Sequence, residues 1–144
     1  MKTEQEQLAA VQEDGYAIRF IENPSEAVKL AAVKQEGFVI KYIENPSEEM
    51  QLEAILQDGR TMQYIDNLSE DVLLLALEQD GFIIEYINSP SEEMQLAAVQ
   101  QDAYAIRYID NPSEAVQLAA VEQDSFAVEY IKNPSEAVKL AARQ

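Results

Sequence analysis

The chain has 144 residues, of which 47% are hydrophobic and 26% are charged, and its formal net charge is −17. This length gives one ordinary domain with a continuous core, and the apolar fraction is too high for a disordered chain. Without His or Cys there is no imidazole base, thiolate nucleophile, disulfide or Cys/His zinc site. No apolar run approaches the roughly 18 residues of a membrane span, and the first residues do not begin a signal peptide. We therefore expect a cytoplasmic protein.

A repeat of 22 residues runs through the whole chain. Prolines, glutamates and leucines keep this spacing, and Leu68 stands where one proline is missing. The columns are Pro24, Pro46, Pro90, Pro112 and Pro134; Glu4, Glu26, Glu48, Glu70, Glu92, Glu114 and Glu136; and Leu8, Leu30, Leu52, Leu74, Leu96, Leu118 and Leu140. Such a period predicts an all-α, right-handed α-solenoid in one domain over residues 1–144. Its helix-turn-helix units would be 1–22, 23–44, 45–66, 67–88, 89–110 and 111–132, with a half unit at 133–144.

Each unit predicts two helices. In the second unit Asn23 would cap the first helix and Pro24 would take its first position. Glu26 would stand third, where its carboxylate can bond the capping residue's amide. The same cap would recur at Asn45, Asn67, Ser89, Asn111 and Asn133. The leucine column would lie in the core, Gly37 would end the first helix in a left-handed conformation, and a shorter second helix would follow.

Two polar residues interrupt apolar columns near the ends of the chain. Glu6 replaces the Val or Met of later units, and Arg143 replaces Val, Ile or Leu. An exposed terminal face needs such residues, so we expect a complete, capped array.

The motif Ala-Val-x-x-Asp-Gly-x-Ala-Ile-x-Tyr is followed by residues 10–20, with Phe20 at its last position, and again by residues 98–108. It resembles bacterial short helical-repeat families of uncharacterised function, and the resemblance covers essentially the whole chain. It implies a stacked-helix fold and brings no known active site. Ala103 and Ser125 replace the motif's glycine, which argues against a strictly left-handed residue in those units.

The acidic residues fall in three groups at fixed positions of the repeat. Besides the glutamate column, one group marks the turn between the two helices and one marks the turn between units. These two groups are Asp14, Glu36, Asp58, Asp80, Asp102 and Asp124, and Glu22, Glu44, Asp66 and Asp110. The glutamate column and the inter-unit group should line one edge, and the remaining group the opposite edge. Capping and solubility would explain these rows without a function, but solubility asks only roughly 2–8 net charges of a small domain.

The middle of the chain departs most from the repeat. No Lys or Arg occurs between Arg60 and Arg107, and Arg60 itself replaces an aromatic residue. The extra leucines Leu73 and Leu75 either compensate the packing around Arg60 or form an exposed apolar patch. The candidate partner-binding residues are Glu53, Leu56, Asp58, Arg60, Asp66, Glu70, Asp71, Leu73, Leu75, Glu78, Asp80, Glu85, Glu92, Glu93 and Asp102.

All eleven aromatic residues fall in two columns. These are Tyr16, Phe38, Phe82, Tyr104 and Phe126, and Phe20, Tyr42, Tyr64, Tyr86, Tyr108 and Tyr130. We expect them to pack in the core with the tyrosine hydroxyls at its rim; a stacking ladder for ligands is the less favoured interpretation.

These features predict a non-catalytic binding protein with no catalytic residue, metal or cofactor. Its acidic surface would dock on a basic protein, including a nucleic-acid-binding one, and would repel nucleic acid and membranes. A sharper hypothesis is DNA mimicry, in which rows of carboxylates block a phosphate-binding groove, as a phage inhibitor of restriction or CRISPR-type complexes would. The alternatives are a structural or scaffolding repeat, or a homodimer through Leu73 and Leu75. A consensus-like engineered array is a third, which the drift among repeats argues against.

Overall fold

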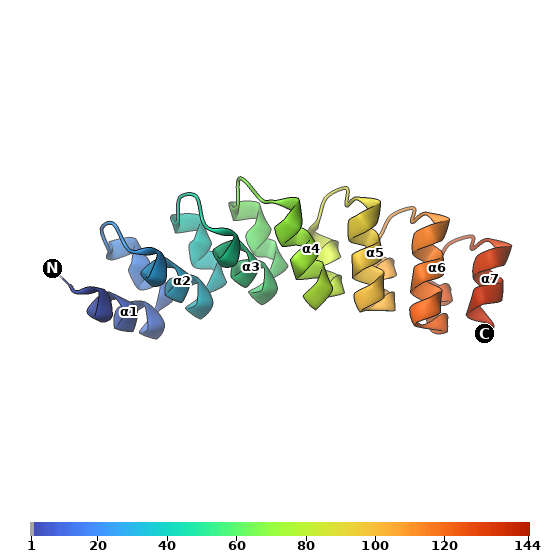
Figure 1. Cartoon of the computed structure of the whole chain (residues 1–144), viewed down its shortest axis with the longest axis horizontal. Helices are drawn as coiled ribbons and strands as arrows, with labels where there is room; N and C mark the ends of the chain where they lie inside the picture. Colours follow the sequence, from blue (N-terminus) through green and yellow to red (C-terminus); the bar gives the residue numbers. More distant parts are fainter. Residues whose placement is uncertain (1) are drawn as a thin grey trace. The chain divides into compact units, whose positions relative to one another are not determined.

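The computed structural model describes residues 2–144, and these residues form α-helices and 3-10 helices but no strand (Figure 1). The all-helical repeat fold predicted from the sequence is confirmed, with about 72% of the residues in helices. The α-helices are α1 (Glu4–Glu13), α2 (Glu26–Gln35), α3 (Glu48–Gln57), α4 (Glu70–Gln79), α5 (Glu92–Gln101), α6 (Glu114–Gln123) and α7 (Glu136–Ala142). The 3-10 helices are η1 (Gly15–Phe20), η2 (Gly37–Tyr42), η3 (Gly59–Tyr64), η4 (Gly81–Tyr86), η5 (Ala103–Tyr108) and η6 (Ser125–Tyr130).

The chain divides into two compact units, Met1–Val72 and Leu73–Gln144. In the first unit α1, α2 and α3 pack in succession, and η1, η2 and η3 form a second row against them. In the second unit α5, α6 and α7 stand side by side, with η4, η5 and η6 packed in the same way (Figure 1). Within each unit every repeat therefore contacts the next, as a solenoid requires. The single domain over residues 1–144 and the right-handed superhelix stay predictions.

The α-helices begin two residues later than predicted. Ser25 is the capping residue of α2, because its Oγ accepts a hydrogen bond from the amide of Val28 at 3.2 Å, and Glu26 is the first helical residue. The same cap is made by Ser47, Ser69, Ser91, Ser113 and Ser135. The glutamate column therefore occupies the first helical position and closes no capping box.

Asn23, the predicted cap, is instead a turn residue. It has a left-handed backbone with φ of 49°, and Asn45, Ser89, Asn111 and Asn133 have φ between 49° and 52°. Asparagine tolerates this conformation better than most residues because its short polar side chain bonds locally. The Asn-Pro pair thus turns the chain before the serine caps the helix.

The prediction of a left-handed glycine after each α-helix is wrong. No described glycine has a positive φ, and α2 ends at Glu36 in an extended conformation. Position 37 requires a small residue because the next repeat approaches closely. A Cβ there would lie 3.0 Å from Oε1 of Gln57 and 3.3 Å from Cα of Ala54. The buried Ala103 in the same column agrees with a requirement for small size and not for a left-handed conformation.

The core is built from three columns of the α-helix and from the middle of each 3-10 helix. In α2 these columns are Val28, Ala32 and Val33, all 0% exposed, and η2 adds Val39 and Ile40. The leucine column was expected here, yet Leu30 and its equivalents are only partly buried and Leu140 is 56% exposed. Leucine stands two residues after the Val28 position, so it is turned about 200° away from it.

Exposed polar residues occupy the two apolar columns near the chain ends. Glu6 is exposed and accepts a hydrogen bond from the amide of Thr3 at 3.2 Å, which completes a capping box on α1. Arg143 is exposed beyond α7. Among residues 2–144, no helix combines the length and apolar character needed to cross a bilayer.

Candidate functional site

The acidic residues at the turn between the two helices of a repeat, here called the turn row, are held by backbone hydrogen bonds. Oδ1 of Asp14 accepts from the amide of Tyr16 at 3.0 Å and so caps η1. The other members of the turn row make the same bond two residues ahead: Glu36, Asp58, Asp80, Asp102 and Asp124. The turn row therefore has a structural task.

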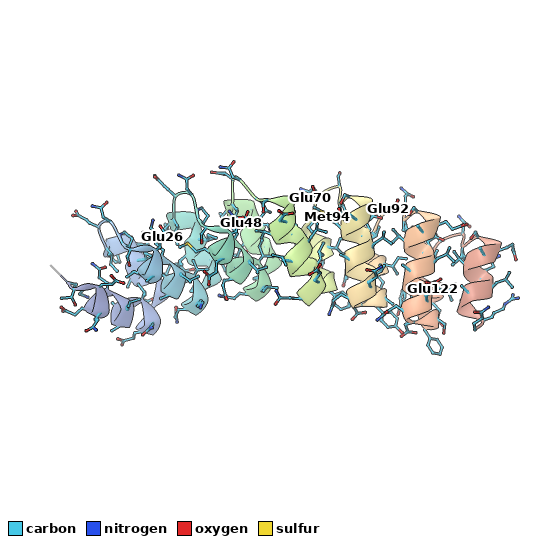
Figure 2. All side chains as sticks on the ribbon, in the orientation of Figure 1. Glu26, Glu48, Glu70, Glu92, Met94 and Glu122 are labelled. Atoms are coloured by element: carbon cyan, nitrogen blue, oxygen red, sulfur yellow. The ribbon has the colours of Figure 1, made fainter. Side chains whose placement is uncertain are left out.

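The acidic residues at the other end of the α-helices are placed differently. We define the loop edge as the glutamate column at the first helical position together with Glu22, Glu44, Asp66 and Asp110 in the preceding loops. Figure 2 shows Glu92 at the loop end of α5 and Glu122 toward the opposite end of α6. All loop-edge carboxylates are exposed, and a negative charge at a helix N-terminus is favourable. The expected placement of the acidic groups at opposite helix ends is confirmed within each repeat.

Few carboxylates have a basic neighbour. In the described part of the chain, ion pairs join Lys29 to Glu26 at 3.2 Å and Lys139 to Glu136 at 3.3 Å. Because 27 acidic residues face 10 basic ones, at least 17 carboxylates have no basic residue of their own. Of the loop-edge carboxylates, Glu26 and Glu136 take part in the ion pairs of the described residues, so most of the charge of this edge is unneutralised.

The second aromatic column, from Phe20 to Tyr130, lies on the surface of the 3-10 helices, which corrects the prediction of core packing for these residues. Tyr42 is 43% exposed, Tyr108 is 39% exposed and Phe20 is 84% exposed. In the first column Phe126 is 66% exposed, and the other rings are partly buried (Tyr16, Phe38, Phe82 and Tyr104). Rings from successive repeats meet edge to face, as in Tyr16 with Tyr42 at 6.2 Å and Tyr104 with Tyr130 at 5.6 Å between centroids. Other pairs of this kind are Phe38–Tyr64 and Phe82–Tyr108. Each pair contributes roughly 0.5–1.5 kcal/mol beyond its burial.

Basic side chains lie over these rings. The guanidinium carbon of Arg19 is 4.9 Å from the Tyr42 centroid, and Nζ of Lys41 is 5.2 Å from Tyr42 and 5.6 Å from Tyr64. In the second unit Arg107 lies 5.3 Å from Tyr108. Gln63, Glu85 and Glu129 occupy this column elsewhere. The 3-10 face is therefore aromatic and locally cationic, unlike the loop edge.

A glutamine column joins consecutive repeats, and sequence reasoning missed it. Oε1 of Gln57 accepts from the amide of Gly37 at 2.7 Å, and its Nε2 donates to the Val33 carbonyl at 2.6 Å. Gln35 and Gln101 accept in the same way from Gly15 and Gly81. The signal was present, because glutamine recurs at this position in every repeat from Gln35 to Gln123.

A second polar column ties α3, α5 and α6 to the loops before them. Nε2 of Gln51 donates to the carbonyl of Pro46 at 3.1 Å, and Gln95 and Gln117 make the equivalent bond at 3.0 Å. Gln51 is only 5% exposed, and its Oε1 is buried without a hydrogen-bond partner among the described residues. An unpaired buried acceptor costs about 1–3 kcal/mol.

Two cavities lie between successive loops of the first unit. One, of about 590 Å³, is lined by Arg19, Lys29, Tyr42 and Glu44, among others. The next, of about 520 Å³, includes Gln51 in its lining. Both therefore open where the loop edge meets the rings of the 3-10 helices.

The structure brings Asp58 and Arg60 together. Nη2 of Arg60 lies 2.6 Å from Oδ2 of Asp58, and the hydrogen bonds of Arg60 hold the pKa of that carboxyl below its ordinary value of 3.8. The Arg60 guanidinium carbon also lies 5.8 Å from the Phe38 centroid. In the second unit, burial raises the pKa of the Tyr104 hydroxyl, and its hydrogen bond with Asp124 raises it further.

The remaining predicted site residues occupy different positions of the repeat. Asp80 and Asp102 are caps of the turn row, whereas Asp66, Glu70 and Glu92 belong to the loop edge. Leu75 is 46% exposed. Of the others, some are partly buried (Glu53, Leu56 and Leu73) and the rest are exposed (Asp71, Glu78, Glu85 and Glu93).

Comparison of the chain with protein-family models, curated proteins and solved structures gave no match. The resemblance to bacterial short helical repeats stays a prediction. Within residues 2–144, no group of three or more His, Cys, Asp or Glu side chains is arranged to hold a metal ion.

Proposed function

We propose that the protein is a non-catalytic binding protein of the cytoplasm whose loop edge docks on a basic segment of another protein. One observation carries this proposal: the acids of the turn row cap 3-10 helices, whereas those of the loop edge stand exposed at successive helix starts. Charge that the fold does not use for its own hydrogen bonds is free to meet a partner.

The sign of the charge selects the partner. A surface of one sign accelerates encounter with a surface of the opposite sign and disfavours partners of like charge. A nucleic-acid backbone and an anionic lipid surface are both of like charge here. DNA mimicry is the narrower form of this proposal, and it requires that the bound partner be released by competing duplex DNA.

The test measures binding of a fluorescein-labelled peptide of arginine–glycine–serine repeats by fluorescence anisotropy. Neutralising the loop edge in E22Q/E26Q/E44Q/E48Q should weaken binding. Raising the salt from about 0.01 M to 0.15 M should weaken it too, because the Debye length falls from about 30 to 8 Å.

A matched control removes the same number of charges elsewhere. E13Q/E78Q/E85Q/E122Q changes exposed acids outside the loop edge, three of them in the last turns of α-helices, where a negative charge is unfavourable. We expect clearly weaker binding only for the loop-edge variant. Equal weakening by both variants would show that net charge acts without a particular edge, which contradicts the proposal.

Self-association is the second candidate, and the exposure of Leu75 at 46% favours it. An exposed leucine beside partly exposed Leu73 suits an apolar contact between two copies. Sedimentation of the wild type and of L73E/L75E distinguishes the candidates: a dimer dissociated by the substitutions supports this one, and two identical monomers exclude it.

A further inference from the structure

The cavity of about 520 Å³ in the first unit combines three kinds of cation-binding group. It lies between the loops at residues 43–47 and 65–69, so the carboxylates of Glu44 and Asp66 line it from two successive loops. The rings of Tyr42 and Tyr64 also line it. Both rings face an ammonium group, because Nζ of Lys41 lies 5.2 Å and 5.6 Å from their centroids.

Gln51 adds an acceptor that lacks a donor. Its side-chain amide is oriented by the bond from Nε2 to the Pro46 carbonyl, so Oε1 is the atom left without a hydrogen bond. The residue is 95% buried and belongs to the lining of this cavity. Oε1 has almost no accessible surface in this structure, so a ligand with an N–H group would supply the missing donor once its entry opens the lining over this atom.

We propose that this cavity binds one arginine side chain of the basic partner. This inference rests on the proposed function, since it names the side chain by which the partner is held. A guanidinium group has five donors in one plane, so it can donate to Gln51 Oε1 and to a carboxylate while its face lies on a tyrosine ring. A lysine ammonium is compact and strongly hydrated, and it lacks the planar fork of donors that could meet an amide oxygen and a carboxylate together.

The neighbouring cavity shows how the chain itself can fill such a site. There Lys29 takes the place of Gln51 in the repeat, and its Nζ is paired with Glu26 at 3.2 Å. Where Gln51 presents an acceptor, Lys29 presents an ammonium group. The substitution Gln51→Lys therefore introduces a residue that this fold already accepts at the equivalent position.

The experiment is a titration of the ¹⁵N-labelled full chain with a peptide that carries one arginine in a glycine–serine background. Binding should shift the side-chain amide signal of Gln51 and should be stronger than binding of the lysine version. Gln51→Lys should weaken it at least about tenfold, the loss expected for one hydrogen bond to a charged group. Gln117→Lys, which changes the same charge at an equivalent bond, should have little effect.

Two further variants test the charge of the bound group and the role of the Gln51 acceptor. Lys41→Ala removes a like charge from the lining and should strengthen binding of the arginine peptide; weaker binding would show that its arginine is not held beside Lys41 and would overturn the proposal. Gln51→Met removes the acceptor without adding charge and should also weaken binding relative to Gln117→Met. Melting curves identify any variant that fails to fold. The variants that do fold then decide whether Gln51 takes part in binding the arginine peptide.

The outcomes separate this inference from the proposed function. If the arginine–glycine–serine repeat peptide binds the loop edge but Gln51→Lys behaves like Gln117→Lys, the arginine site is wrong and the basic partner stands. If neither peptide binds at low salt, both are wrong. Equal or tighter binding of free arginine would assign the cavity to a small molecule and reject a docked side chain.

Discussion

The turn row and the loop edge have the same sign of charge and the same 22-residue spacing, but the fold uses them differently. Asp102 accepts a hydrogen bond from the amide of Tyr104 at 2.9 Å and holds η5 in place. Glu92, ten residues earlier, stands exposed at the first position of α5. The comparison teaches that periodicity identifies a row, and that only the hydrogen bonds show whether its charge is available to a partner.

Within each unit both rows depend on the packed core, so the largest effect should come from a core residue. Ile55→Ala, at a side chain that is 1% exposed, should lower the free energy of unfolding by about 2–5 kcal/mol. Leu52→Ala, in the partly buried leucine column of the same helix, should lower it less. Chemical denaturation measures both free energies of unfolding. If the two substitutions cost the same, the leucine column would belong to the core.

The close approach of repeats at the turn row gives the next effect. A Cβ on Gly81 would meet the carbonyl oxygen of Ala98 and Oε1 of Gln101, so Gly81→Ala should cost about 1–3 kcal/mol by overpacking. Ala103→Gly is the matched change in the same column, and it should cost less because no clash is created. If Gly81→Ala left the melting temperature unchanged, position 81 would not require a residue without a Cβ.

Asp102→Ala and Glu92→Ala test the two rows directly within one repeat. Loss of the cap at Asp102 should cost about 0.5–2 kcal/mol. Loss of Glu92 removes only a charge beside the helix N-terminus, worth about 0.3–1 kcal/mol and screened by salt. If denaturation curves showed that Glu92→Ala lowers the free energy of unfolding more than Asp102→Ala, the capping role assigned to the turn row would be wrong.

The smallest effect concerns the ion pair within the turn row. Arg60→Ala should raise the pKa of Asp58 part of the way toward 3.8, because the side-chain hydrogen bonds of Arg60 are the largest cause of the lowering and the backbone amide bond of residue 60 is kept. A carboxyl whose pKa is lowered in the folded state stabilises the fold at pH values above its ordinary pKa. This stabilisation is lost as the pH falls through the folded-state pKa. For an exposed pair it amounts to less than about 1 kcal/mol. Carboxyl NMR titration of wild type and variant measures the shift, and an unchanged Asp58 would exclude the pair as its cause.

The sequence predicted the helical repeat well but placed the caps wrongly. Asn-Pro-Ser-Glu contains two capping candidates, Asn23 and Ser25, and the capping-box rule favours the one with a glutamate three residues on. At the third position after Ser25 stands the buried Val28, so that rule does not find the serine. The hydroxyl column continues to Thr3, which no Asn-Pro pair precedes, and this was the available signal.

The second aromatic column was misplaced because the second helix of each repeat is a 3-10 helix. With α-helical periodicity, Phe38 and Tyr42 would share a buried face. With three residues per turn, Ile40 and Ile43 share it instead, and both are buried while Tyr42 is exposed. The cavity at Gln51 could not be predicted, since its glutamine bonds a loop carbonyl whose position depends on the left-handed turn at Asn45.

The most direct measurement of the central claim is carboxyl labelling of the wild-type chain with carbodiimide and glycine ethyl ester, read by mass spectrometry. Labelling is compared with and without the arginine–glycine–serine repeat peptide. The account predicts that the peptide protects Glu22, Glu44 and Glu48 on the loop edge and leaves Asp14 and Asp80 of the turn row unchanged. Equal protection of both rows, or protection of the turn row alone, would contradict it.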